Sequence, residues 1–423
     1  MHDQTVQDAL ALLRPGDTIA AGAYFHEPQG FLSQLHHAAE QIEDLSLWTA
    51  NVLQDYPVLA EDCRKLRWLA AFYDRNARAA HLRRQVTYYP VDLHEMGEMM
   101  CRSKRPTVFV AAVPPMEPDG TYCVSSSLQW EPECVAAADR IILEVNPAIP
   151  HTPSPLRIPA ERVSCVYQAD APVPVLRYAA APSPEEAAIG GYVSQLIHDG
   201  DCVQFGLGGM PNAVAAALTD KHDLGSHTEM LVTALVGLIQ SGVVTHHRKS
   251  LHPGKTVCTF ALGDEKVIRF LDNNPDVLFR PAAYTNQPSV ISQNEHMVSV
   301  NTALQVDLLG QICSEAIGSR QYSGTGGAMD FACGAHSAPG GRSIVALSAT
   351  AKGGALSRIS AALPLGSAVS IPRNIVDYVV TEFGIARLWG CSVRQRVENL
   401  IAVAHPDFRA ELARDAQKLL LWY

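Results

Sequence analysis

Hydrophobic positions along this chain fall into short continuous runs that alternate with longer stretches of helical periodicity. The runs have the length of buried strands and include TVFVAAV (107–113), RIILEV (140–145), SIVAL (343–347) and DYVVTEFGIA (377–386). Between such runs, PNAVAAALTD (211–220) and VRQRVENLIAVA (393–404) repeat apolar residues at the spacing of one helix face. Apolar strands separated by amphipathic helices are typical of parallel sheets covered by helices. The pattern therefore predicts an α/β fold with largely parallel sheets.

One part of this pattern occurs twice. ALALLRPGDTIAAGAY (9–24) runs from a short apolar helix through a Gly-Asp turn into a strand, and SQLIHDGDCVQFGLGG (194–209) does the same. The two turns begin at residues 16 and 200, so they lie 200 minus 16, or 184, residues apart. The pairs Thr49-Ala50 and Thr233-Ala234 have the same offset, 233 minus 49. We therefore predict two similar open α/β domains.

A proline-rich passage separates the two copies. It contains TPSPLRIPAERV (152–163) and APVPVLRYAAAPSPEEAA (171–188), which hold too many prolines to sustain regular structure. Ser183, Pro184 and Glu186 then follow the order of a helix start, with Ser183 as the cap and Glu186 completing a capping box. We predict a boundary near residue 180, with an N-terminal domain over 1–180 and a C-terminal domain over 181–423.

Length and composition agree with two cores and exclude several classes of protein. The chain has 423 residues, of which 47 % are hydrophobic and 18 % are charged. Its net charge is -10, and it contains no block of Lys and Arg that could neutralise the phosphates of a nucleic acid. The first residues lack the basic and apolar regions of a secretory signal, and no apolar run approaches the roughly 20 residues of a membrane helix. We expect a cytoplasmic protein that binds neither nucleic acid nor membrane.

Metal binding is not indicated. The 10 cysteines occur singly, without a CxxC pair, and are expected to be buried small hydrophobic residues. His222, His227 and Glu229 lie five and two residues apart, which matches no standard helical set of zinc ligands. The GxSxG, P-loop and HExxH motifs are also absent from the sequence, which argues against serine hydrolases, P-loop NTPases and zinc metalloproteases.

Two glycine-rich segments are candidates for binding an anion or a substrate oxygen. Gly206-Leu207-Gly208-Gly209-Met210 follows the predicted strand CVQF and precedes the predicted helix NAVAAAL, the place where open α/β sheets bind ligands. It lacks the third glycine of the dinucleotide fingerprint, so NAD is disfavoured. The second segment, SGTGGAMDF (323–331), offers further backbone amides for close approach. A glycine needed only for the geometry of a turn explains either segment equally well.

Glu229 lies in the loop DKHDLGSHTEM (220–230), just before an apolar stretch. The offset of 184 residues pairs it with Leu45, so one copy has a carboxylate where the other has an apolar residue. From the residues alone, a solvated glutamate beside a loop is the favoured interpretation.

Several segments, taken together, resemble the acetyl-CoA hydrolase/transferase family, and the branch of 4-hydroxybutyrate and butyrate CoA-transferases is the most similar. They are FGLGGMPNAVAAAL, HTEM, NTALQVDLLGQICSEAIG, YSGTGGAMDFACGA, YVVTEFGIARL and AHPDFRAEL. The resemblance is dense from about residue 185 to 415. Before residue 180 it rests on RPGDTIAAG, the pair Glu27-Pro28, PPMEPDGTYCVSSS and ILEVNPAIPHT.

The resemblance implies two similar domains with the active site in the cleft between them, and a homodimer or homotetramer. It implies that Glu229 is the nucleophile and that coenzyme A is bound as a substrate, with no metal. It assigns Gln204 to the substrate carboxylate, and contacts with CoA or the oxyanion to Gly206, Leu207, Gly208, Gly209, Met210, Gln305, Gly327 and Lys352.

A glutamate fits this chemistry, because its unperturbed pKa near 4.3 leaves it ionised at neutral pH without an adjacent base. We expect a ping-pong reaction through a glutamyl-CoA thioester. SSSLQWEPE (125–133) and TPSPLRIPAERV depart from the family pattern in segments that shape the acyl pocket, so the acid substrate stays open. It is a short monocarboxylate such as acetate or butyrate, a hydroxyacid such as 4-hydroxybutyrate, or a dicarboxylate such as itaconate. An acyl-CoA hydrolase and a non-catalytic CoA-binding protein are the alternative functions.

Overall fold

The computed structural model describes residues 4–60, 65–169, 171–177 and 181–421. The chain forms two compact units: unit 1 contains residues up to 177 together with 257–285, and unit 2 contains 178–256 and 286–423. The predicted division into 1–180 and 181–423 stays a prediction, because compactness does not show which part folds by itself.

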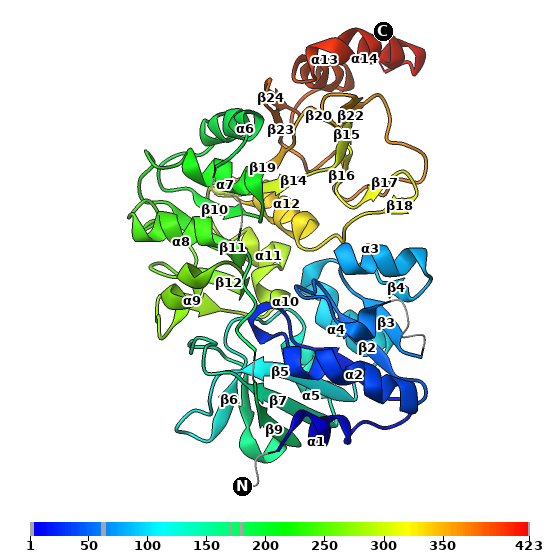
Figure 1. The fold of residues 1–423 in the computed structure, drawn as a ribbon. Helices are drawn as coiled ribbons and strands as arrows, with labels where there is room; N and C mark the ends of the chain where they lie inside the picture. The colour runs from blue at the N-terminus through cyan, green and yellow to red at the C-terminus, as the bar shows by residue number, and fades with distance from the viewer. Residues whose placement is uncertain (1–3, 61–64, 170, 178–180, 422–423) are drawn as a thin grey trace. The chain divides into compact units, whose positions relative to one another are not determined.

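Unit 1 is built on a parallel sheet of seven strands in the order β4-β3-β2-β1-β5-β7-β9 (Figure 1). Its strands are β1 (Thr18–Ala21), β2 (Ser46–Thr49), β3 (Arg67–Ala70), β4 (Val86–Tyr88), β5 (Val108–Val113), β7 (Arg140–Val145) and β9 (Cys165–Gln168). Its longer helices are α2 (Gln29–Gln41), α3 (Arg75–Leu82), α4 (Met96–Ser103) and α5 (Glu131–Ala137).

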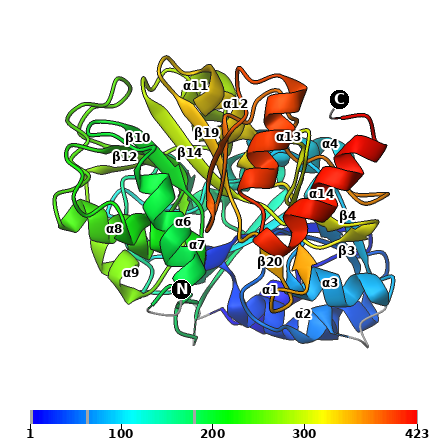
Figure 2. The same cartoon turned by 90° about the horizontal axis from the view of Figure 1, so that it is seen from above.

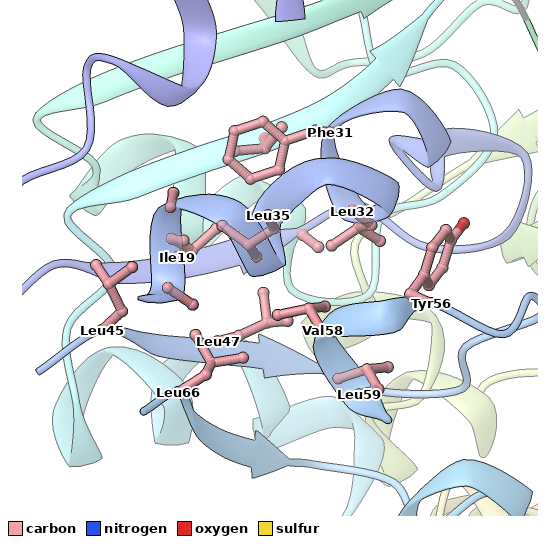
Figure 3. Packing of buried hydrophobic residues seen from close by; sticks show 14 of the residues in the cluster. Ile19, Phe31, Leu32, Leu35, Leu45, Leu47, Tyr56, Val58, Leu59 and Leu66 are labelled. Carbon is pink, nitrogen blue, oxygen red and sulfur yellow. The ribbon is translucent and has the colours of Figure 1, made fainter. Parts of the chain in front are cut away.

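The core of unit 1 forms where α2 packs on the sheet. The buried residues Phe31, Leu32, Leu35, Ala38 and Ala39 recur at helical spacing and so share one face of α2. This face meets Ile19 of β1, Leu47 of β2 and Val58 of the segment between β2 and β3 (Figure 3). Each large side chain buried in this way stabilises the fold by about 1.5–3 kcal/mol.

Unit 2 contributes most of a second sheet, which has eight strands in the order β13-β12-β11-β10-β14-β19-β23-β24. The strands are β10 (Cys202–Phe205), β11 (Gly225–Leu231), β12 (Thr256–Ala261), β13 (Val277–Phe279), β14 (Met297–Thr302), β19 (Arg342–Ala346), β23 (Tyr378–Thr381) and β24 (Gly384–Arg387). Within this sheet, β10 pairs with β11 and β14, β14 with β19, and β19 with β23 in parallel, whereas β24 pairs with β23 in antiparallel. Both sheets agree with the predicted α/β class.

Helices cover the unit 2 strands and carry the glycine segments. They include α6 (Pro184–Ser194), α7 (Gly209–Ala216), α8 (Thr233–Gln240), α12 (Ala328–Ser337), α13 (Val393–Ala402) and α14 (Pro406–Lys418). Figures 1 and 2 both show α6 beside α7, and α13 beside α14. The helix α6 begins at the predicted capping box, where the Ser183 hydroxyl accepts the Glu186 N–H at 3.2 Å and the Glu186 carboxylate accepts the Ser183 N–H at 2.9 Å.

The predicted internal repeat is confirmed by strand order and by side chains. The order β2-β1-β5-β7-β9 of unit 1 matches β11-β10-β14-β19-β23 of unit 2. Each Gly-Asp turn carries a buried ion pair, Asp17 with Arg140 at 2.5 Å and Asp201 with Arg342 at 2.5 Å. In each pair the arginine begins the equivalent strand, β7 or β19.

The pairing of Glu229 with Leu45 is wrong. The backbone N–H of Ser46 donates to the Asp17 carbonyl, and the N–H of Gly225 donates to the Asp201 carbonyl in the same way. Ser46 therefore corresponds to Gly225, an offset of 225 minus 46, or 179. The connection before β11 is five residues shorter than the one before β2, so Glu229 corresponds to Ala50, which is also apolar and buried.

Candidate active site

Glu229 lies in β11 and is partly buried, not solvated. Its Oε2 atom accepts a hydrogen bond from Nδ2 of Asn286 at 3.0 Å. The backbone N–H of Gly327 also donates to its carboxylate. A Cβ atom built on Gly327 would overlap Oε2 of Glu229, so only glycine allows this approach. The carboxylate is therefore held between a side-chain amide and a backbone amide.

The helix α12 begins beside this carboxylate. Gly327 is its N-cap, and the helix runs for 10 residues from Ala328 to Ser337. Unpaired N–H groups and the positive end of the helix dipole favour negative charge at such a terminus. The second glycine segment thus presents donors to the predicted nucleophile.

Opposing effects set the pKa of Glu229. Burial raises the pKa of Glu229 to about 7, and the nearby carboxylate of Asp330 also raises it, whereas the hydrogen bonds from Asn286 and Gly327 lower it. The expectation of an unperturbed, fully ionised glutamate at neutral pH is therefore wrong. Both the protonated and the ionised form of Glu229 are therefore populated near neutral pH.

The first glycine segment is partly helical. The helix α7 begins at Gly209, so Gly209 and Met210 lie in its first turn and not in a loop before Asn212 as predicted. Gly208 has φ of +127°, which side chains rarely adopt, and a Cβ atom on Gly209 would overlap the Glu186 carboxylate. Turn geometry and packing thus explain these two glycines. Gly206 has open space around its Cα atom and no such explanation.

Gln204 and Gln305 each have a buried Oε1 atom that accepts no hydrogen bond from the described part of the chain. Gln204 lies in β10, opposite Ser299 of β14. Gln305 begins the short strand β15 (Gln305–Asp307). Lys352 has φ of +52° in the turn between β20 (Thr350–Ala351) and β21 (Leu356–Ser357).

The structure brings only part of the predicted site into direct contact. Gly327 touches Glu229, whereas no hydrogen bond joins Glu229 to Gln204, Gln305 or Lys352 within the described ranges. Sequence reasoning missed Asn286, because a single Asn 57 residues away in the chain carries no motif. In the residues that the structure describes, no group of three or more His, Cys, Asp or Glu side chains is placed to hold a metal ion.

Comparisons with known proteins agree with the resemblance. The family model "Acetyl-CoA hydrolase/transferase C-terminal domain" matches residues 263–416. The chain is 38 % identical to the succinyl-CoA:cyclohexane-1-carboxylate CoA transferase of Geobacter metallireducens over 97 % of its length and 94 % of the relative. It is 39 % identical to the 4-hydroxybutyrate coenzyme A transferase of Clostridium kluyveri over 84 % of its length and 83 % of the relative. The crystal structure of RipA from Yersinia pestis superimposes with a TM-score of 0.92 at 32 % identity, covering 99 % of this chain and 97 % of RipA.

Proposed function

Starting from the fact that this chain belongs to the acetyl-CoA hydrolase/transferase family and is a CoA-transferase, we propose that Glu229 is its nucleophile. The enzyme moves CoA between an acyl-CoA and a small carboxylic acid. The observation that carries the proposal is the carboxylate of Glu229 held by Asn286 and Gly327 at the N-terminus of α12.

The reaction has two matching halves. The ionised Glu229 attacks the acyl-CoA carbonyl, the C–S bond breaks, and an acyl-glutamyl anhydride and CoA thiolate form. The thiolate then attacks the glutamyl carbonyl and releases the first acid, which leaves a glutamyl-CoA thioester. The incoming acid repeats these steps in reverse order. One acid leaves before the next binds, so the kinetics are ping-pong.

Each step passes through a tetrahedral oxyanion. The amides of Asn286 and Gly327 already point at the Glu229 carboxylate, so they are placed to stabilise an oxyanion that forms on the glutamyl carbon. One such donor is typically worth about 100- to 1000-fold in rate. We assign Gly206–Met210, Gln305 and Lys352 to contacts with CoA and Gln204 to the substrate carboxylate. The open space at Gly206 and the two unpartnered glutamine oxygens support these assignments.

The acid substrate belongs to a class of small carboxylates. The names of the relatives cover 4-hydroxybutyrate, butyrate, acetate, succinate and cyclohexane-1-carboxylate. We favour a short monocarboxylate or hydroxyacid, with a dicarboxylate such as itaconate as the alternative. Acetyl-CoA hydrolase is the second candidate function, because a relative with that name matches at 26 % identity over 69 % of this chain. We propose that the protein forms a homodimer or homotetramer. None of the described helices is long and apolar enough to span a bilayer.

Trapping the thioester tests the nucleophile. Incubation with an acyl-CoA and no acceptor acid should leave CoA on Glu229, and borohydride should reduce the thioester and fix a mass change on the peptide that contains it. Glu229→Ala and Glu229→Gln should abolish both the label and the transfer. A label on another acidic residue, or substantial activity in Glu229→Ala, would refute the assignment.

Release of CoA from acetyl-CoA, measured with and without a panel of carboxylic acids, separates the two candidate functions. Transfer depends on the added acid and yields a new acyl-CoA that mass spectrometry identifies. Release at the same rate without any acid would instead establish the hydrolase.

A further inference from the structure

The second glycine loop (323–327) contacts a buried carboxylate of unit 2, that of Glu315, which is 6 % exposed. Glu315 precedes the hairpin of β17 (Ala316–Ile317) and β18 (Arg320–Gln321). Its carbonyl oxygen accepts the backbone N–H of Tyr322 at 2.7 Å and of Ser323 at 3.0 Å. The hairpin therefore returns the chain to Glu315 at the start of the loop.

The side chain of Glu315 binds the same loop farther along. Its Oε2 atom accepts the Thr325 hydroxyl at 3.4 Å and the Gln321 amide at 3.3 Å. Its Oε1 atom accepts the Ser370 hydroxyl at 2.9 Å, and Ser370 in turn accepts the Ser314 N–H at 3.0 Å. One carboxylate thus joins three segments of unit 2.

The loop has little rigidity of its own. Three of its five residues are glycine, and Gly326 has φ of +56°. Ordering one flexible residue costs about 1–2 kcal/mol, so external contacts must fix the conformation. Thr325 lies only two residues before Gly327, whose N–H donates to Glu229. Because such donors act within a narrow range of distance, a small shift of the loop would weaken their effect.

We propose that Glu315 is a positioning residue for CoA transfer, which holds Thr325 and thereby keeps the Gly327 N–H against Glu229. This inference rests on the proposed function of Glu229. Glu315 acts through the loop and does not touch the reacting atoms.

Two nearly isosteric substitutions test the contact. Thr325→Val removes the hydroxyl, and Glu315→Gln replaces an acceptor oxygen by an NH₂ group that faces other donors. Each should lower kcat about 10-fold, which corresponds to about 1.4 kcal/mol, with KM for acyl-CoA changed less than about 2-fold. Thr325→Ser keeps the hydroxyl and should restore kcat to within about 3-fold of wild type.

The pH profile separates positioning from general stability. Weaker donation from Gly327 removes an effect that lowers the pKa of Glu229, so the acidic limb of the kcat profile should move to higher pH in both variants. Asn286 and Asp330 also act on this carboxyl group and are unchanged in them. Glu398→Gln, which breaks an exposed ion pair with Arg394, is the matched control and should leave kcat and the profile unchanged.

Combining the substitutions completes the test. If both act through one contact, the double variant should lose much less than the product of the single losses. Fully multiplicative losses of kcat in the double variant would overturn the inference. Wild-type kcat and pH profile in Thr325→Val would also overturn it, even if Glu315→Gln fails to fold. If the wild-type enzyme forms the CoA label on Glu229 and Thr325→Val keeps wild-type kcat and pH profile, only this inference is disproved. Wild-type enzyme that does not transfer CoA disproves the proposed function instead.

Discussion

At the scale of single residues, the carboxyl group of Glu229 is subject to opposing influences. Burial and the carboxylate of Asp330 favour the protonated acid, whereas Asn286 and Gly327 favour the anion. The nucleophilic role that we propose needs the anion, and the pKa of about 7 keeps both forms of Glu229 populated near neutral pH. A carboxylate that is less well solvated than in water is also a stronger nucleophile, which suits attack on a thioester.

This shifted pKa predicts a gain in stability when Glu229 is made neutral. Between about pH 4.5 and 7 the folded protein keeps a proton that an unfolded glutamate releases, so the folded state loses stability as pH rises through this range. We expect Glu229→Gln to be more stable to urea than wild type by about 1–3 kcal/mol at pH 8, and equally stable near pH 4. The same comparison with Glu398→Gln, which lies in an exposed ion pair, should show no such pH dependence. Equal stability of Glu229→Gln and wild type at pH 8 would show that folding does not raise the pKa of Glu229.

At the scale of elements, the start of α12 is shaped to meet the strand β11. Gly327 has φ of -99°, which any residue adopts, so its need for glycine comes from the contact with Glu229 and not from the backbone. Gly208 differs, because its φ of +127° requires glycine for conformation alone. Glycine is therefore required for different physical reasons in the two glycine-rich segments.

Gly327→Ala should separate activity from folding. The added methyl group must displace the Glu229 carboxylate, so we expect kcat to fall by about 100-fold or more while the urea midpoint changes little. Gly237 in α8 has open space at its Cα atom, and Gly237→Ala is the matched control that should keep full activity. If Gly327→Ala retains full activity, the approach of Gly327 to Glu229 has no catalytic role.

At the scale of the whole molecule, the chain uses one α/β design twice. Both copies place an aspartate after a glycine turn and pair it with the first residue of the equivalent strand, Arg140 or Arg342. Only the second copy has a carboxylate in the strand next to this turn, since Ala50 takes the place of Glu229 in the first. The repeat therefore supplies the framework, and one difference within it supplies the carboxylate that we propose as the nucleophile.

The two buried ion pairs predict a large and similar loss of stability when either aspartate is neutralised. Asp17→Asn and Asp201→Asn should each lower the free energy of unfolding by about 3–5 kcal/mol, because each leaves a buried arginine without its counter-charge. Urea unfolding followed by tryptophan fluorescence and by circular dichroism measures the loss. The exposed pair of Arg394 and Glu398 is the control, and Arg394→Gln should cost less than about 1 kcal/mol. Losses as small as the control would show that the buried pairs do not stabilise the units.

The sequence by itself determined what depends on neighbours in the chain. Apolar runs and helical spacing predicted the two parallel sheets, the Gly-Asp turns predicted the repeat, and Ser183 with Glu186 predicted the start of α6. These features are local, because strand burial, turn conformation and capping involve residues a few positions apart. The motif resemblance also nominated Glu229, although local spacing alone favoured a solvated side chain.

Only the tertiary structure decided the environment of that glutamate. Asn286 is 57 residues from Glu229 in the chain, yet its amide donates to the Glu229 carboxylate. Glu315 lies farther along the chain, yet it contacts Thr325 of the glycine loop that ends at Gly327. The register of the strands, not the offset of the turns, showed that Ala50 is its counterpart. Burial, hydrogen-bond donors and a nearby carboxylate come from segments that meet only when the sheet and α12 are assembled. The pKa of Glu229 is therefore a property of the fold, which no local pattern in the sequence encodes.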